Sequence, residues 1–281
     1  MRRLEERFFI VLMLLSAVII VGSFFVIVGS IIKIGYPALT LDMFTKIPEG
    51  GFYFGKTGGV LNAIVGSIYI SIGASVLGLF ISIPVALYLN VYLRRNSTLA
   101  ALTRLSHDVL FGIPSIVYGA FGFTIMIYLG YKASLLGGIL TVTLLVIPIM
   151  IRTMDEVMRS APKELADATY SLGATKFEAA QILLKQSAGG VFTAILLALG
   201  RAIGDAASVM FTAGFSDNIP TNLSEPAPTL PLAIFFQLGS PLKEVQARGY
   251  ASALILTMIV VLISITARLI SKRFQKNHIQ G

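Results

Sequence analysis

The chain has 281 residues, of which 56% are hydrophobic and only 13% are charged. This composition is too apolar for one or two ordinary soluble domains. The formal net charge of +8 does not indicate nucleic-acid binding, because the basic residues are spread over short loops between apolar runs, as in membrane proteins. Cysteine is absent, which excludes disulfides, thiolate metal sites and cysteine nucleophiles.

Six apolar segments predict six transmembrane helices, because each is close to or above the roughly 20 residues that a helix needs to cross a bilayer core. Their continuous apolarity excludes a β-barrel, whose strands alternate in polarity. The sequence therefore predicts an all-α integral membrane protein with a single transmembrane domain over residues 1–281. The segments cover about residues 8–34, 60–89, 108–130, 133–151, 187–215 and 249–270.

Basic residues are distributed unequally between the two predicted sides of the membrane. With a cytoplasmic N-terminus, 15 of the 22 Lys and Arg residues lie on the cytoplasmic side and six on the outer side, and Arg201 alone falls inside a span away from its ends. Cytoplasmic loops of membrane proteins carry an excess of Lys and Arg. Both termini are therefore predicted to be cytoplasmic.

Two connections are too long to be simple turns. The outer loop, residues 216–248, holds five of the 11 prolines. Within it, Leu230 to Leu238 is apolar enough to lie at the membrane interface or to dip into the protein. The inner loop covers residues 152–186 and carries the clearest local signals in the chain.

Residues 50–57 satisfy the G-x-x-x-x-G-K-[ST] pattern of a phosphate-binding loop. Such a loop needs a buried strand before it and a helix whose N-terminus points at the phosphates. Here the motif leads into a membrane span and faces outside, where nucleotide is not expected. We interpret it as an external loop with aromatic side chains at the membrane interface.

The inner loop carries signals for a helix, a glycine turn and a second helix. Pro162 suits the first helical turn, Glu164 is an acid near the positive end of the helix, and Gly173 suits a left-handed position after its end. Thr175 and Glu178 then form a capping-box pattern that begins the second helix.

Leu165, Ala168 and Leu172 are spaced to share one apolar face of the first helix. From the residues alone, two interpretations stay open. The helix pair either lies at the membrane interface, stabilised by lipid, or forms a knob presented to a cytoplasmic partner.

The stretch from Glu164 to Gly173 resembles the coupling loop of ABC importer permeases, a short helix that docks into a groove of the ATP-hydrolysing subunit. The run from Ile147 to Leu184 is similar to the A-type permease subunits of Pst phosphate importers, within the MetI-like importer permease superfamily. Three further stretches fit that family: Gly58 to Ser67, Gly112 to Gly119, and Gly200 to Ala207.

Two positions depart from the family pattern. The family usually has Glu at the position of Asp205, and Leu-Pro at the position of Leu184-Lys185. The resemblance implies that the first helix of the inner loop docks on the ATPase. The residues expected to contact it are Glu164, Leu165, Ala168, Leu172 and Gly173.

Arg201 and Asp205 are the only oppositely charged pair inside a predicted span, and their i, i+4 spacing places them on one helix face. An ionised residue in the middle of a membrane costs on the order of 3 kcal/mol, which favours a functional role. One interpretation is a structural ion pair. The other is an anion pathway, in which Arg201 binds phosphate oxygens and Asp205 keeps that arginine oriented. The family resemblance favours the pathway.

The resemblance implies a non-catalytic permease subunit that moves inorganic phosphate across the cytoplasmic membrane and needs no cofactor or metal. The implied partners are a pair of ATP-binding subunits, a homologous second permease subunit of the PstC type and an extracytoplasmic phosphate-binding protein. Two alternatives stay open. The first is an importer of another oxyanion such as molybdate or sulfate, and the second is a self-sufficient channel or secondary transporter.

Overall fold

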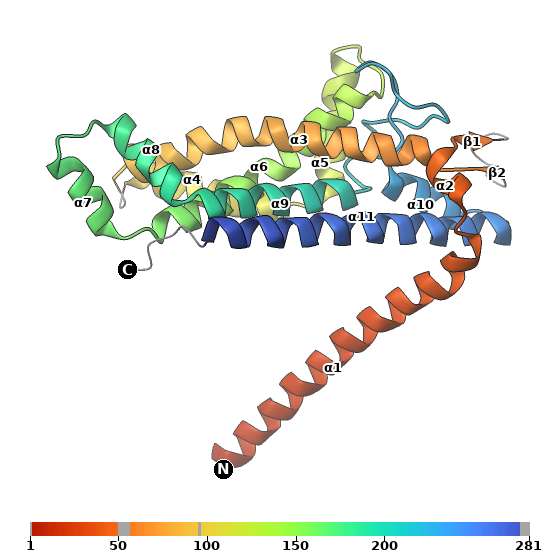
Figure 1. Ribbon diagram of the computed structural model, residues 1–281, viewed down its shortest axis with the longest axis horizontal. Coiled ribbons are helices and arrows are strands. Elements are labelled where there is room, and N and C mark those ends of the chain that lie inside the picture. Colours follow the sequence, from red (N-terminus) through yellow and green to blue (C-terminus); the bar gives the residue numbers. More distant parts are fainter. Residues whose placement is uncertain (1, 50–56, 95–96, 276–281) are drawn as a thin grey trace.

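The computed structural model describes residues 2–49, 57–94 and 97–275. In this part of the chain, four helices form the body of the molecule (Figure 1). The all-α prediction is confirmed for this part of the chain, apart from one pair of two-residue strands. The four helices are α3 (Leu61–Leu87), α6 (Leu135–Arg159), α9 (Ala188–Gly204) and α11 (Lys243–Gln275).

Small side chains let α9 lie against α3 and α6. Ala194 and Ala198 of α9 are fully buried and belong to one core cluster with Val146 and Met150 of α6 and Ala74 of α3. Small residues at such positions let helix backbones approach closely, which drives packing where lipid surrounds the bundle.

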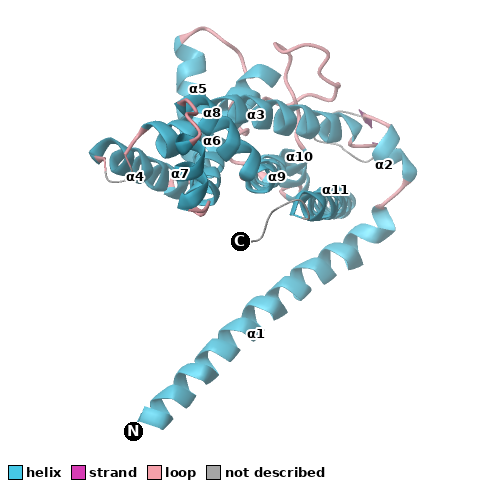
Figure 2. Ribbon diagram, turned by 60° about the vertical axis from the view of Figure 1, so that its left-hand side comes forward, coloured by secondary structure: helices cyan, strands magenta, loops and turns pink. Residues whose placement is uncertain are grey.

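Helix α1 (Arg2–Gly35) leaves the bundle at an angle and stands apart from it in both ribbon views (Figures 1 and 2). Gly35, at its end, lies so close to the backbone of Tyr250 in α11 that a Cβ there would be 2.6 Å from the Tyr250 carbonyl oxygen. The rest of α1 is highly apolar, and no residue of its most apolar window is buried inside the chain. This surface suits lipid or another membrane protein.

Short elements close one end of the bundle, which we call the hairpin end. They are η1 (Tyr36–Ala38), α2 (Leu41–Thr45), and the strands β1 (Pro48–Glu49) and β2 (Thr57–Gly58). The strands pair antiparallel, with Pro48 opposite Gly58 and Glu49 opposite Thr57. The phosphate-loop-like pattern lies outside the described residues except for Thr57, which begins β2.

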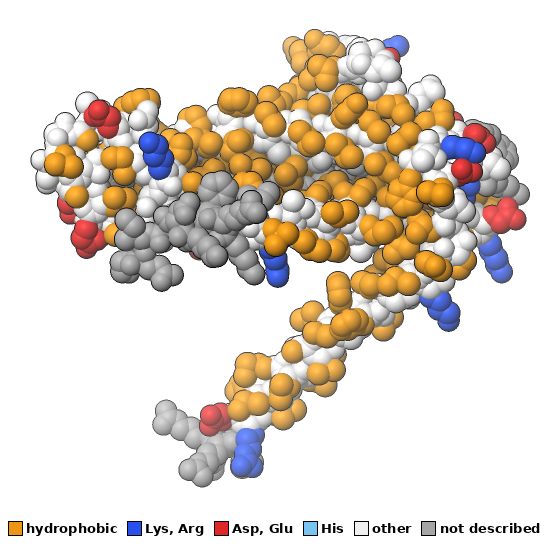
Figure 3. Space-filling view, viewed as in Figure 1, with side chains coloured by type: hydrophobic (Ala, Val, Ile, Leu, Met, Phe, Trp, Pro, Cys, Tyr) orange, Lys and Arg blue, Asp and Glu red, His pale blue; other side chains and the backbone are white. Residues whose placement is uncertain are grey.

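The opposite end carries α7 (Lys163–Ser171) and α8 (Lys176–Gln186), and we call it the coupling end (Figure 1). Helix α6 runs to Arg159 and so extends into the predicted inner loop. Hydrophobic side chains cover the bundle between its ends, whereas most charged side chains on the face in Figure 3 gather at the two ends. This is the distribution expected of a bundle that crosses a membrane.

Within the part of the chain that the structure describes, four helices are long and apolar enough to span a membrane, and two bent helix pairs bring the number to six if each pair is one span. One pair is α4 (Thr98–Gly112) and α5 (Ser115–Tyr128), bent by 98°. The structure therefore differs from the continuous helix expected over 108–130. The bend falls at Ile113 and Pro114, because a proline disfavours helical geometry in the residue before it and lacks an N–H.

The helix expected over 187–215 also differs, because α9 ends at Gly204. The other bent pair, α8 and α9, meets at 67° where this predicted helix begins. Beyond α9 the chain is irregular as far as α10 (Leu230–Leu238), whose bounds match the apolar stretch noted within the outer loop. Leu230, Leu232 and Ala233 are buried, so α10 dips into the protein.

The π-helical segment η2 (Tyr88–Tyr92) extends α3 at the coupling end. A turn of π-helix contains one more residue than a turn of α-helix and is frequently found at functional sites. It brings Asn90 toward α6, as described below.

Candidate functional site: an arginine on an open helix face and a coupling element

Arg201 lies on the side of α9 that the bundle does not cover. Buried Ala194, Ala198 and Ala202 follow each other at intervals of four residues and mark the covered side. The Arg201 side chain is 50% exposed. A Cβ added at either flanking glycine, Gly200 or Gly204, would meet no heavy atom within 4 Å. The face around Arg201 is thus open in the single chain.

Asp205 lies one turn further on and is buried, with a side chain only 6% exposed. Its Oδ1 atom is 3.8 Å from Nη2 of Arg201, so the two predicted residues form a loose ion pair. Its Oδ2 atom accepts a hydrogen bond from the backbone N–H of Ser208 at 2.8 Å. The carboxylate therefore orders the backbone turn after α9 as well as facing the arginine.

The expected shared helix face is only partly correct, because Asp205 is the extended residue that ends α9, with φ −85° and ψ 123°. The carboxylate offers a hydrogen-bond acceptor to Ser208, and such local side-chain to backbone bonds compete with helix formation. Asp205 still contacts Arg201, because α9 is regular up to Gly204 and ends only at Asp205.

The first part of the irregular segment after Asp205, residues 206–215, is largely buried in protein. The Thr212 carbonyl accepts from the N–H of Ser134 at 2.9 Å, and the N–H of Ala227 donates to the Ala213 carbonyl at 2.9 Å. Non-helical backbone at membrane depth is tolerated only where protein or a water-filled cavity satisfies its polar groups. Gly119 of α5 makes room here, since a Cβ would lie 2.8 Å from the Ala207 carbonyl oxygen.

The second predicted site is the helix, glycine turn and helix of α7 and α8, whose local structure is confirmed. Gly173 has φ +77°, in the left-handed region that favours glycine. Thr175 and Glu178 form a complete capping box. The Glu178 carboxylate accepts from the Thr175 N–H at 2.7 Å and from its hydroxyl at 2.8 Å, and these bonds, the backbone one first, lower the pKa of Glu178.

The predicted docking residues mostly face outward. Leu172 is 89% exposed, which leaves a large apolar side chain uncovered in the single chain. Glu164, Ala168 and Gly173 are also exposed, whereas Leu165 is half-buried.

The single apolar face expected for Leu165, Ala168 and Leu172 is therefore wrong. Leu172 follows the last residue of α7 and ends the helix, while Leu165 faces the bundle. The covered side instead includes Thr169, whose hydroxyl donates to the Leu165 carbonyl at 2.6 Å. This local bond lets a polar residue face the bundle, which the apolar spacing alone did not reveal.

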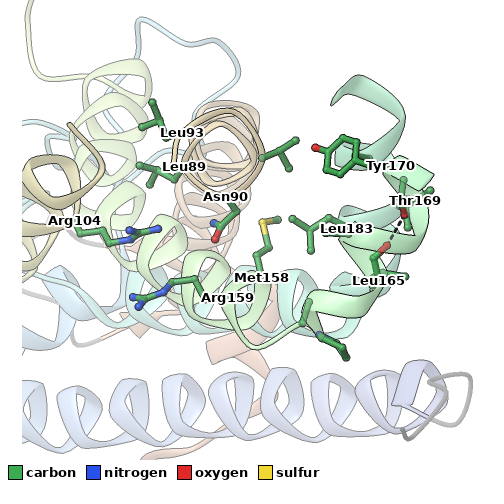
Figure 4. A pocket seen from close by; sticks show the side chains of 16 residues that line it. Leu89, Asn90, Leu93, Arg104, Met158, Arg159, Leu165, Thr169, Tyr170 and Leu183 are labelled. Carbon is green, nitrogen blue, oxygen red and sulfur yellow. Dashed lines mark hydrogen bonds between the residues drawn. The ribbon is translucent and has the colours of Figure 1, made fainter. Parts of the chain in front are cut away.

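A cavity of about 240 Å³ separates α7 and α8 from the rest of the coupling end (Figure 4). Leu165, Thr169 and Tyr170 of α7 line one side, and Asn90 of η2 and Met158 of α6 line the other. Helix α7 is thus poorly supported by the bundle and is free to change its position more easily than a close-packed helix.

A polar cluster around the buried carboxylate of Asp155, beside this cavity, was not predicted. Arg104 of α4 donates from Nε and Nη2 to the two carboxylate oxygens of Asp155 in α6, at 2.8 and 3.0 Å. Asn90 donates to Asp155 Oδ1 at 2.8 Å. These residues flank three different apolar segments of the sequence, so no local pattern connects them.

Comparison with known proteins places this chain in a family. A family model described as "Binding-protein-dependent transport system inner membrane component" matches residues 78–277. The chain therefore belongs to this family of membrane permease components.

Similar proteins narrow the assignment within the family. The "Phosphate transport system permease protein PstA" of Yersinia pestis is 36% identical over 272 residues, which cover 96% of this chain and 90% of that protein. The protein of the same name from Haemophilus influenzae is 31% identical over 254 residues, 89% of each chain. The resemblance to PstA-type permeases is thus confirmed, and with it a multi-pass protein of the inner membrane.

Among solved structures, the MetNI methionine ABC transporter in an inward-facing conformation aligns with a TM-score of 0.61. The alignment covers 75% of this chain and 94% of that one at 18% identity, which shows a shared fold alone. The PstA relatives are named as permease proteins, which agrees with the prediction of a non-catalytic subunit.

Proposed function

We propose that this chain is the membrane-spanning permease subunit of an ATP-driven importer of inorganic phosphate. The observation that carries the proposal is Arg201, a half-exposed cation on an open helix face, in a chain whose PstA relatives are named for phosphate transport. A guanidinium binds phosphate oxygens through a planar fork of donors. Burial of Asp205 beside it keeps the arginine oriented and partly neutralised, so that the anion is released again.

The open face of α9 supports a pathway that lies between two permease subunits. Arg201, Gly200 and Gly204 line a surface that the single chain leaves uncovered. A homologous second permease of the PstC type would cover it and complete the passage. An extracytoplasmic phosphate-binding protein would deliver the anion at the hairpin end.

The coupling end supports docking to a pair of ATP-binding subunits, on which ATP hydrolysis would take place. Leu172 is an exposed apolar side chain whose burial against a partner would be favourable, and Glu164, Leu165, Ala168 and Gly173 shape the surface around it. The coupling end and both termini would then be cytoplasmic. In this arrangement residues 1–281 form one permease domain that crosses the membrane six times, with α5 and α9 as the membrane-crossing parts of the two bent pairs.

Reconstitution of the complete complex in liposomes tests the proposal. Phosphate uptake should require ATP and the binding protein, and should exceed uptake of sulfate and molybdate at equal concentration. Preferred uptake of another oxyanion would overturn the substrate assignment. Uptake by this chain without an ATPase would instead indicate a channel or secondary transporter.

A further inference from the structure

The cluster of Arg104, Asp155 and Asn90 joins three elements around the buried carboxylate of Asp155. Both carboxylate oxygens of Asp155, on α6, are engaged by the guanidinium from α4, and one also accepts from the amide of η2. Asp155 is only 7% exposed. Burying an ion pair carries a desolvation penalty that its attraction often does not exceed, so stability alone does not explain this arrangement.

A second ion pair between the same two helices shows the contrast. Arg152 of α6 lies 3.3 Å from Asp108 of α4, and both side chains are about half exposed. Arg152 also lies 5.2 Å from the centre of the Phe111 ring of α4, so both of these contacts join α4 to α6 and neither reaches a third element. The buried cluster has a fixed bidentate geometry, which sets the relative position of its helices more strictly than a single contact.

The cluster is connected to the coupling element through η2. Asn90 also donates to the Ala86 carbonyl at 2.9 Å, so its amide is held between α3 and α6. Two residues on, Lys176 of α8 lies 5.7 Å from the centre of the Tyr92 ring. The cavity beneath α7 is lined by both Asn90 and Arg104 (Figure 4). A displacement of α7 and α8 would therefore reach η2 and the cluster through these contacts.

The cluster is connected to the pathway through the bend between α4 and α5. Tyr118 of α5 donates its hydroxyl proton to the Leu110 carbonyl of α4 at 2.8 Å, which ties the two sides of the bend together. One residue further, Gly119 abuts the carbonyls of Ala207 and Ser208. These residues directly follow Asp205, so α5 touches the segment that positions Arg201.

We propose that Arg104, Asp155 and Asn90 are positioning residues for energy coupling. They hold α4, α6 and η2 together, so that movement of α7 and α8 on the ATPase shifts the α4–α5 bend against the segment after Arg201. This inference rests on the function proposed above. It assigns the three residues no contact with phosphate or ATP.

The ratio of phosphate transported to ATP hydrolysed, measured per assembled complex in liposomes, tests this role. Asp155→Asn weakens the bidentate pair, and the ratio should fall about tenfold, within the usual range of coupling energies, while hydrolysis continues. Asp108→Asn is the matched control, because it breaks the exposed pair between the same helices, and its ratio should equal that of the wild type. A wild-type ratio for Asp155→Asn would overturn the proposal.

Two more variants separate positioning from simple support of the fold. Asn90→Leu keeps the side-chain volume and leaves the Arg104–Asp155 pair intact, yet it should also lower the ratio. Arg104→Lys keeps the charge but not the fork, and it should give an intermediate ratio. If the variants only reduce the amount of assembled complex and the ratio stays constant, the cluster is structural. Absence of phosphate uptake by the wild-type complex would instead contradict the proposed function.

Discussion

Gly173 allows the docking role of α7 to be tested through the backbone alone. Its φ of +77° is strained for any residue with a Cβ, yet a Cβ there would meet no heavy atom within 4 Å. The Cβ of Gly173→Val is therefore accommodated, and the expected cost of the variant is the left-handed conformation, on the order of 1–2 kcal/mol. A penalty of that size changes the balance between turn conformations about 5- to 30-fold.

The expected result is a complex that inserts and assembles but transports poorly. When the turn rearranges, α7 no longer points at the ATPase in the same direction, so both stimulation of ATP hydrolysis and phosphate uptake should fall. Gly173→Asn should be milder, because Asn enters the left-handed region more readily than a β-branched residue. Uptake and ATPase activity are measured at equal abundance of complex.

Gly130 provides a matched control within the same chain. It follows α5, has φ +74°, and a Cβ there would also meet nothing within 4 Å. Gly130→Val thus imposes the same backbone strain away from the coupling end and should leave coupling intact. Normal transport and ATPase stimulation by the Gly173→Val complex would refute the docking role of α7.

Three further predictions concern the pathway and the start of α8. The Arg201→Gln complex should assemble normally but lose most phosphate uptake. Uptake by the Arg201→Lys complex should also be low, because an ammonium lacks the planar fork of donors. Wild-type uptake by either variant would show that Arg201 does not belong to the pathway. Asp205→Asn should preserve the fold, since its side-chain oxygen still accepts from Ser208, yet slow phosphate release in single-turnover measurements. The pKa of Glu178 is lowered, so its contribution to the α8 cap is complete above the ordinary glutamate pKa and is lost as pH falls through the lowered value. Hydrogen exchange at the Thr175 amide, corrected for the intrinsic rate, should become faster over that pH range. The Glu178→Gln variant should lack this pH dependence.

Features set by neighbouring residues were predictable from the sequence. The glycine turn at Gly173 and the capping box of Thr175 and Glu178 depend on a few adjacent side chains, and both occur where expected. The apolar stretch Leu230–Leu238 was likewise recognisable, because a short helix that enters the protein needs no polar face. The docking role of the α7 residues stays a prediction.

Features that depend on distant parts of the chain were not predictable. Asp155 is 51 residues from Arg104 and 65 from Asn90, so only the packed bundle brings them together. The bend between α4 and α5 lies within a continuous apolar run. Hydrophobicity indicates that such a run lies in the membrane, but it does not indicate where a helix changes direction. The end of α9 at Gly204 is similarly invisible, because residues 206–215 continue the apolar run beyond it.

The end of α9 and the charge of Arg201 occur at the same place for a physical reason. The last turn of a helix carries unpaired carbonyls with a partial negative charge, which stabilises a cation there. Asp205 adds a full negative charge 3.8 Å away. A continuous helix through this region would provide neither the carbonyls nor the turn that Asp205 orders. Breaking the helix thus lowers the cost of holding an arginine within the membrane, while the open side of α9 leaves its remaining donors available to an anion.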